Sequence, residues 1–87
     1  MRDEDISDAL DAIQQAKINN VFKNIKIGNV TIRVEQGYET SWIGMIVGTA
    51  VIVTIQIGKN DIISEGDRDI TSAINKAKSK FLWMFIH

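Results

Sequence analysis

The side chains that could support acid–base chemistry form two close pairs of carboxylates, Glu35 with Glu39 and Asp67 with Asp69. In such a pair one carboxyl group can donate a proton while the other accepts one. Any acidic loop supplies similar pairs, however, and the sequence has no nucleophile elbow, P-loop, dinucleotide fingerprint or HExxH motif. We therefore expect no enzymatic activity and no catalytic residues.

Residues for metal and cofactor chemistry are scarce. The chain has no cysteine, and its single histidine is the last residue, His87, with no second ligand at metal-binding spacing. Three neighbouring carboxylates, Asp3, Glu4 and Asp5, fit the first turn of a helix, where they complement the positive end of the helix dipole. We expect neither a metal nor a cofactor.

Basic residues that could follow a phosphate backbone are Lys23, Lys26 and Arg33. No aromatic residue lies among them to stack on bases, and the formal net charge of the chain is −1, from 10 basic and 11 acidic side chains. We therefore do not expect nucleic-acid binding.

A small ligand is an alternative binding partner. Arg33, Tyr38 and Trp42 could hold a phosphate or a base, and Gly44 and Gly48 would let the backbone approach a ligand closely. This pattern suggests, as a second hypothesis, an oligomeric protein that sequesters a nucleotide-like molecule.

Isoleucine dominates the apolar residues, with sixteen isoleucines and only two leucines among 87 residues. β-Branched side chains favour strands because they are stiff and pack well on a pleated surface. Most of them lie between Ile25 and Ile63, so the middle of the chain is expected to form a sheet. We treat residues 1–87 as a single small domain, which has to be stabilised by packing and self-association because disulfides are absent.

Two local patterns define the first half of the chain. Apolar residues at helical spacing predict a helix over Asp3–Asn19. Alternation over 22–35, with Gly28-Asn29 as a two-residue turn, predicts a β-hairpin. In the register that pairs Ile27 with Val30, one side of the hairpin is apolar and the other carries Asn24, Lys26, Thr31 and Arg33.

A second hairpin is predicted over residues 42–57, after a polar link at Gln36–Ser41 and with Gly48-Thr49 as its turn. Both of its sides are apolar near the turn, so both have to be covered. Two helices of modest length cover one side, and we expect the other side, or the edge, to meet another copy of the protein.

A transmembrane segment is the competing interpretation of Thr40–Gly58, which has 19 residues without a charge. Under this alternative the chain is a small membrane-associated protein. The segment is rich in β-branched residues, contains Gln56 and lacks a flanking Lys/Arg cluster, all of which favour strands. No basic and apolar leader opens the chain, so we expect a cytoplasmic location, or the host cytoplasm if the gene is viral.

The last third predicts a short fifth strand at Ile62-Ile63 and a second helix capped by Ser64 or Asp67. The predicted fold is α+β, an antiparallel sheet of four to five strands in two hairpins, flanked by an N-terminal and a C-terminal helix in the order α-β-β-β-β-α. Large apolar groups surround the helix axis at its C-terminal end, and a single-faced helix cannot bury them all.

Exposed aromatic residues and methionines are typical of protein contacts. We expect a small non-enzymatic interaction protein that forms a homo-oligomer and binds another protein. Its composition would suit a phage or mobile-element inhibitor of a host system. The predicted partner or oligomer interface comprises Trp42, Ile46, Val51, Val53, Trp83, Met84, Phe85 and Ile86.

Overall fold

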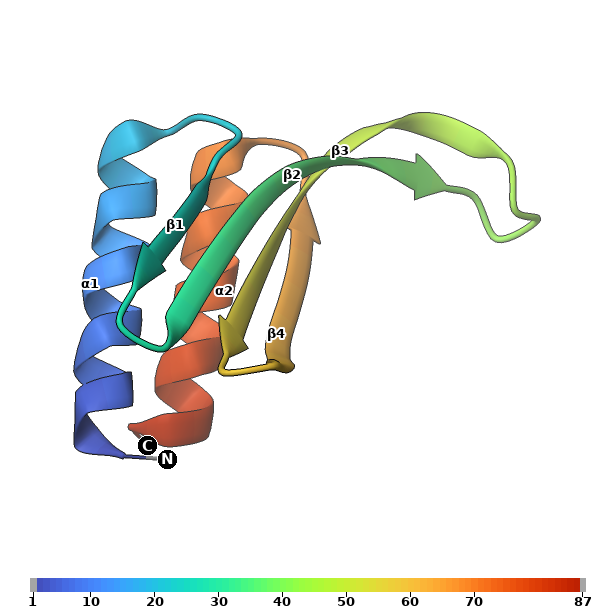
Figure 1. Cartoon of the computed structure of the whole chain (residues 1–87). Coiled ribbons are helices and arrows are strands. Elements are labelled where there is room, and N and C mark those ends of the chain that lie inside the picture. The colour runs from blue at the N-terminus through green and yellow to red at the C-terminus, as the bar shows by residue number, and fades with distance from the viewer. Residues whose placement is uncertain (1, 87) are drawn as a thin grey trace.

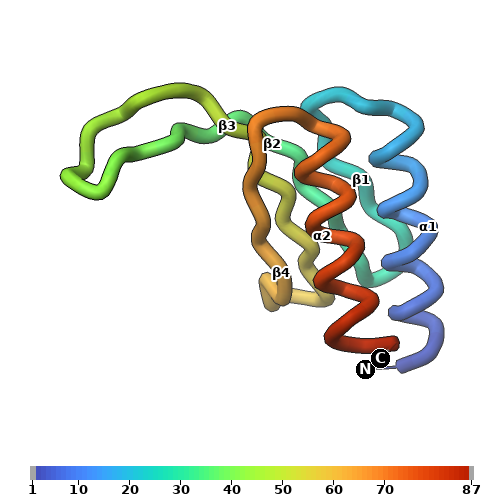
Figure 2. Tube along the Cα trace, turned by 180° about the vertical axis from the view of Figure 1, so that it is seen from behind, coloured from blue at the N-terminus to red at the C-terminus, as the bar shows by residue number. Residues whose placement is uncertain are grey.

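The computed structural model describes residues 2–86 and has two layers, a four-stranded antiparallel sheet and two helices that cover one of its faces (Figures 1 and 2). The strands follow one another across the sheet in the order β1-β2-β3-β4. The elements are α1 (Asp3–Asn19), β1 (Asn24–Ile27), β2 (Val30–Thr40), β3 (Ile46–Ile57), β4 (Asn60–Asp67) and α2 (Ile70–Phe85). The predicted α-β-β-β-β-α order and α+β class are confirmed.

Helix α1 has the predicted bounds, because its start and stop signals are local. Its first turn holds Asp3, Glu4 and Asp5. Asn20 takes the left-handed conformation (φ 50°), and its N–H donates to the Ala16 carbonyl at the C-terminal end of the helix. Apart from Asp5 in the first turn, the buried residues are three alanines and one isoleucine, which lets the helix lie close to the sheet: Ala9, Ala12, Ile13 and Ala16.

The first hairpin has the predicted register, with Ile27 opposite Val30 and Ile25 opposite Ile32. Gly28 has a positive φ of 57°, which the two-residue turn requires. Its apolar side faces the helices and its polar side faces away from them, so the predicted division into a dry and a wet face is confirmed.

The predicted turn at Gly48-Thr49 is wrong. The chain reverses between Ser41 and Met45, and residues 48 and 49 lie inside β3. Strand β2 correspondingly continues through the predicted polar link as far as Thr40. The observed arrangement pairs β2 with β3 from Val30 opposite Ile57 to Thr40 opposite Ile46. A turn at residues 48 and 49 would have left the second half of β2 without this backbone partner.

Two further predictions about the last third are corrected. Ile62 and Ile63 belong to the fourth strand, β4, so there is no fifth strand among residues 2–86. Ser64 lies within β4 opposite Thr54 and does not cap α2. The cap is Asp69, whose carboxylate accepts hydrogen bonds from the Ser72 backbone N–H (2.8 Å) and hydroxyl (3.0 Å).

The hydrophobic core lies between the helices and the covered face of the sheet. Phe81 of α2 is its largest fully buried side chain. Every element except β1 contributes at least one side chain that is at most 2% exposed, and Ile25 of β1 is 7% exposed. Representative members are Ile13, Ile32, Val53, Ile55, Ile63, Ile74 and Phe81.

The opposite face of the sheet is polar and makes its own hydrogen bonds. The Arg33 guanidinium donates to Gln56 Oε1 and Asp61 Oδ2, at 3.1 Å each, and lies 3.5 Å from Glu35 Oε1. Thr54 is buried in the same region. The expectation that β3 has to be covered on both faces therefore fails for the half of β3 that lies over the helices.

Element lengths explain the shape of the molecule. Helices α1 and α2 have 17 and 16 residues, or about 25 Å each. Strand β4 has eight residues and a similar length, about 26 Å. Strands β2 and β3 have 11 and 12 residues, or roughly 35–40 Å. The β2–β3 pair therefore extends beyond the helices at one end (Figure 1).

The uncharged segment Thr40–Gly58 forms the end of β2, the reversal and β3. Neither of the two helices in residues 2–86 has the length and apolar character needed to cross a membrane.

Candidate functional site

A projecting arm is the most unusual surface of the molecule. We define the arm as residues 37–50, the part of the β2–β3 pair that lies beyond the helices (Figures 1 and 2). Pairing with β1 ends at Arg33, and pairing with β4 ends where Val51 lies opposite Asp67. The arm is consequently a two-stranded ribbon with both edges open.

The side chains of the arm are largely apolar and exposed. Trp42 at the tip is 96% exposed, and Ile46 is 65% exposed. Glu39 is the only charged residue of the arm, and no lysine or arginine occurs between Arg33 and Lys59. The exposed apolar side chains of the arm, which we call the arm tip, are Tyr38, Trp42, Ile43, Met45, Ile46 and Val47.

Backbone hydrogen bonds fix the reversal at the end of the arm. The Ser41 N–H donates to the Met45 carbonyl (2.8 Å), and the Gly44 N–H donates to the Ser41 carbonyl (2.9 Å). The Met45 N–H donates to the Ser41 hydroxyl (3.3 Å). Gly44 has a φ of 85°, a conformation that other residues rarely adopt. These bonds hold Trp42 and Ile43 at the outermost point of the arm.

Such a ribbon is poorly stabilised on its own. A two-stranded hairpin without a packed face is marginally stable in water. Contiguous exposed apolar groups of this kind mark interaction sites on folded proteins. The arm therefore has the composition of a buried segment and the surroundings of an exposed one.

The predicted interface residues divide into three groups. Trp42 and Ile46 belong to the arm tip. Val51 and Val53 lie in the core of this chain, so they are not accessible to a partner. The remaining four are at the C-terminal end of α2, at the opposite end of the body from the base of the arm (Figure 1): Trp83, Met84 and Ile86 are exposed, and Phe85 packs on Phe81 with ring centroids 5.1 Å apart.

Sequence reasoning missed Ile43, Met45 and Val47 as exposed residues because it placed the turn at Gly48-Thr49. The sequence does contain a signal for a turn at Gly44, because the uncharged segment continues on both sides of this glycine. It also missed a second exposed apolar group at the end of α1, formed by Ile18, Val21 and Phe22. No periodic pattern indicates this group, since two of its members lie in a connection.

The predicted ligand contacts do not converge. Arg33 is engaged with Gln56, Asp61 and Glu35 on the polar face. Trp42 lies in the reversal at the end of the arm, and Tyr38 is nearer to the base of the arm. The three side chains form no common pocket in residues 2–86.

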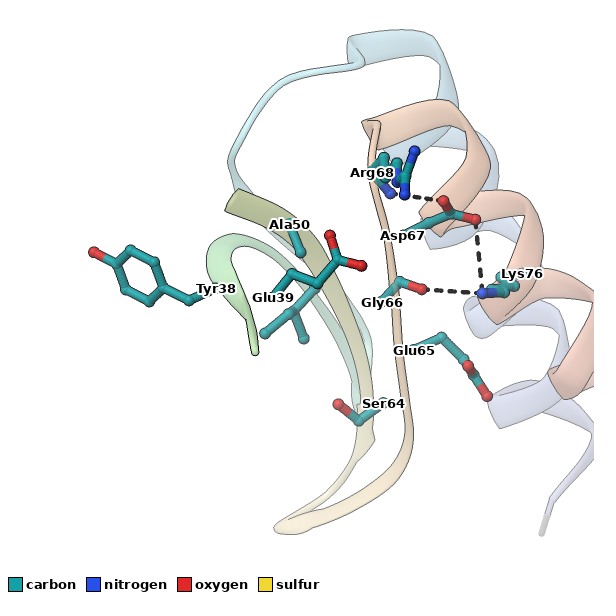
Figure 3. A pocket seen from close by; sticks show the side chains of 10 residues that line it. Tyr38, Glu39, Ala50, Ser64, Glu65, Gly66, Asp67, Arg68 and Lys76 are labelled. Carbon is teal, nitrogen blue, oxygen red and sulfur yellow. Dashed lines mark hydrogen bonds and ion pairs between the residues drawn. The ribbon is translucent and has the colours of Figure 1, made fainter. Parts of the chain in front are cut away.

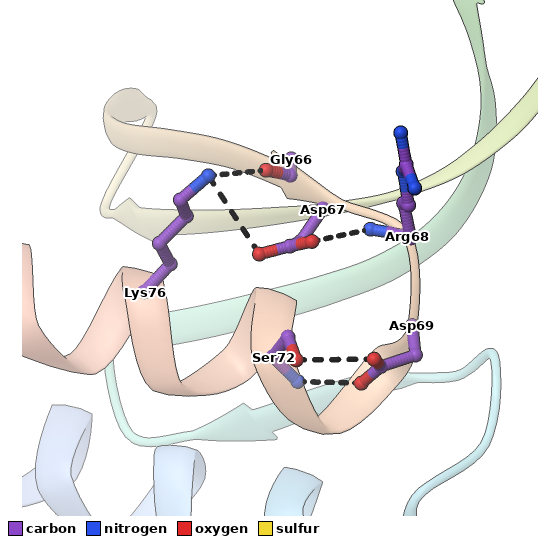
Figure 4. Close-up of polar contacts among 6 residues, drawn as sticks. All are labelled: Gly66, Asp67, Arg68, Asp69, Ser72 and Lys76. Atoms are coloured by element: carbon purple, nitrogen blue, oxygen red, sulfur yellow. Dashed lines mark hydrogen bonds and ion pairs between the residues drawn. The ribbon is translucent and has the colours of Figure 1, made fainter.

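A cavity of about 460 Å³ lies between the arm and the C-terminal end of β4 (Figure 3). Its lining includes five charged residues, of which Lys76 and Asp67 pair with each other. Lys76 Nζ donates to the Gly66 carbonyl (3.2 Å) and lies 3.7 Å from Asp67 Oδ2, while Asp67 Oδ1 accepts from the Arg68 N–H (2.6 Å) (Figure 4). The cavity therefore has a polar lining, in which Lys76 and Asp67 are already engaged with each other and with the backbone.

Three of the four carboxylates in the predicted pairs have structural partners. Glu35 lies beside Arg33, Asp67 lies beside Lys76, and Asp69 caps α2. Within residues 2–86, no three metal-ligating side chains come together. His87 lies outside the residues that the structure describes.

Comparisons with protein-family models, curated proteins and solved structures find no match to this chain. The arm and the surfaces around it are the features of the molecule that indicate a function.

Proposed function

We propose that this chain is a protein-interaction module that binds through its arm, with the arm tip filling an apolar depression on another protein molecule. The observation that carries the proposal is the exposure of six large apolar side chains on a ribbon that no other element of residues 2–86 covers. Binding would bury them and add a packed face to a hairpin that is marginal by itself.

The charge of the arm supports a protein partner over a nucleic acid. A ribbon that enters a DNA or RNA groove needs basic residues to neutralise phosphates. The arm has Glu39 and no lysine or arginine. Trp42 and Tyr38 are the residue types that most often anchor protein interfaces.

Site-specific photo-cross-linking in the producing cells tests this proposal. A photoreactive phenylalanine derivative replaces Trp42 at the arm tip, and in a matched control it replaces Lys59, an exposed residue in the turn between β3 and β4. We expect a protein adduct from position 42 in at least tenfold excess over position 59.

Competition then distinguishes specific docking from non-specific adhesion. Excess native protein should suppress the adduct, and the Ile43→Asp/Ile46→Asp double variant should not, because both substitutions charge the arm tip. Equal adducts from positions 42 and 59, or equal competition by both proteins, would refute the proposal.

A further inference from the structure

A second exposed apolar group lies where α1 joins β1. We define the corner as Lys17, Ile18, Val21, Phe22 and Lys23. Its three apolar side chains are at least half exposed. Neither lysine has an ion-pair partner among residues 2–86, which is also true of Lys26, Lys59 and Lys78.

The corner is held in a fixed position by hydrogen bonds on both sides. The Val34 N–H donates to the Lys23 carbonyl (3.1 Å), which ties the connection to β2. The Thr71 hydroxyl donates to Asn20 Oδ1 (3.3 Å), which ties it to the start of α2. A partner that binds here meets a surface that is already organised, so little conformational entropy is lost.

Arm and corner are complementary in chemistry. Both expose large apolar groups, but the arm carries a carboxylate, Glu39, and the corner carries two cations, Lys17 and Lys23, none of which has an ion-pair partner in residues 2–86. Opposite charges beside two apolar surfaces favour their association and fix its orientation. The arm does not meet the corner of its own chain, because it extends from β2 and β3 in the direction away from α1 (Figures 1 and 2).

We propose that the partner of the arm is a second copy of this chain, whose corner receives the arm tip. This inference rests on the proposed function, since it names the molecule that the arm binds. The arm and the corner lie at the same end of the body (Figure 1). A two-fold axis near that end places each arm on the corner of the other copy, so that the same contact forms twice.

The arrangement places Glu39 of each copy near Lys17 and Lys23 of the other. Two equivalent contacts bury two arm tips and two corners, which brings the buried surface closer to the roughly 1,600 Å² of a standard interface. A single contact would leave one arm and one corner exposed.

Charge reversal gives a direct test. The Lys17→Glu/Lys23→Glu variant has an acidic corner and an acidic arm, and the Glu39→Lys variant has a basic corner and a basic arm. Each should lose self-association by at least tenfold in sedimentation or light scattering at micromolar concentration, with an unchanged circular dichroism spectrum. An equimolar mixture of the two should form a heterodimer, because every arm then meets a corner of opposite charge.

The control variant is Lys26→Glu/Lys59→Glu, which reverses two exposed lysines away from the corner. It should associate as the native protein does. If corner reversal leaves association unchanged while arm variants abolish it, the arm binds another site on the second copy and the corner assignment is wrong.

The outcome also separates this inference from the proposed function. A native protein that stays monomeric at 100 µM refutes the second copy as partner. An arm-dependent cross-link to a different protein in that case would still support the arm as a binding element. Absence of any arm-dependent cross-link would refute both.

Discussion

The two halves of β3 have similar composition and different surroundings. Residues 51–57 lie between β2 and β4 and over the helices, and Ile55 is fully buried there. Residues 46–50 continue the same strand into the arm, where Ile46 is 65% exposed. The hydrophobic character of a β-branched strand does not decide its burial. Burial depends on whether the helices extend over the strand, and the helices are only about as long as β4.

This comparison separates residues that stabilise the fold from residues available for binding. Apolar groups under the helices stabilise the fold, because folding removes their surface from water and packs them closely. Apolar groups in the arm contribute little to folding and remain available for a partner.

Alanine substitution of two isoleucines in β3 should change the free energy of unfolding by very different amounts. Ile55→Ala removes a fully buried side chain and should lower the free energy of unfolding by about 2–5 kcal/mol. Ile46→Ala in the arm should change it by less than about 0.5 kcal/mol. Urea denaturation of dilute protein measures both. Similar losses for the two variants would mean that the arm is part of the folding unit.

Amide hydrogen exchange should be fast in the part of β3 that lies in the arm and slow in the part that lies over the helices. In dilute protein, amides of residues 46–50 should exchange at least about a hundredfold faster than those of residues 52–56, because local opening of the ribbon requires no disruption of the core. Raising the protein concentration should slow exchange in the arm alone if a second copy covers it. Uniform protection along β3 at low concentration would contradict the division.

The cap of α2 provides a smaller effect within the body. Asp69→Ala removes the acceptor of two hydrogen bonds from Ser72 and should cost about 1 kcal/mol. Ser64→Ala is the control, because Ser64 is an exposed strand residue that the sequence offered as an alternative cap. It should change stability by less than about 0.5 kcal/mol. A larger loss from Ser64→Ala would place the cap where the sequence suggested.

Surface charges should show the smallest effects on stability. Lys80 lies 3.1 Å from Glu65 on the body, and both side chains are partly exposed. Lys80→Ala should therefore cost about 0.2–1 kcal/mol, less at high salt. Glu39→Gln in the arm should leave unfolding unchanged, since Glu39 has no ion-pair partner in residues 2–86. A measurable loss of stability in Glu39→Gln would show that the carboxylate has a partner within its own chain.

The sequence was sufficient wherever the controlling interactions are local. The bounds of α1 follow from apolar spacing and from acidic residues in the first turn, and the register of the first hairpin follows from a two-residue turn between alternating strands. Both depend on contacts between residues close in the chain.

The reversal at Ser41–Met45 was missed for a different reason. Two glycine positions, Gly44 and Gly48, compete as turn sites in one uncharged run. The choice between them depends on how many backbone groups of β2 form hydrogen bonds with β3. This number is set by the full length of the β2–β3 pair and not by the residues of the turn. Trp42 likewise could be assigned to a core or to a surface only after the turn was placed.

The sequence by itself determined the fold class, the first helix, the first hairpin and the surplus of apolar residues in the middle of the chain. Only the tertiary structure decided which of those residues are buried, that Asp69 and not Ser64 or Asp67 caps α2, and that the arm tip and the corner are exposed at one end. The physical reason is that periodicity and turn chemistry act over a few residues, whereas burial depends on the relative lengths of strands and helices that meet only after the chain has folded.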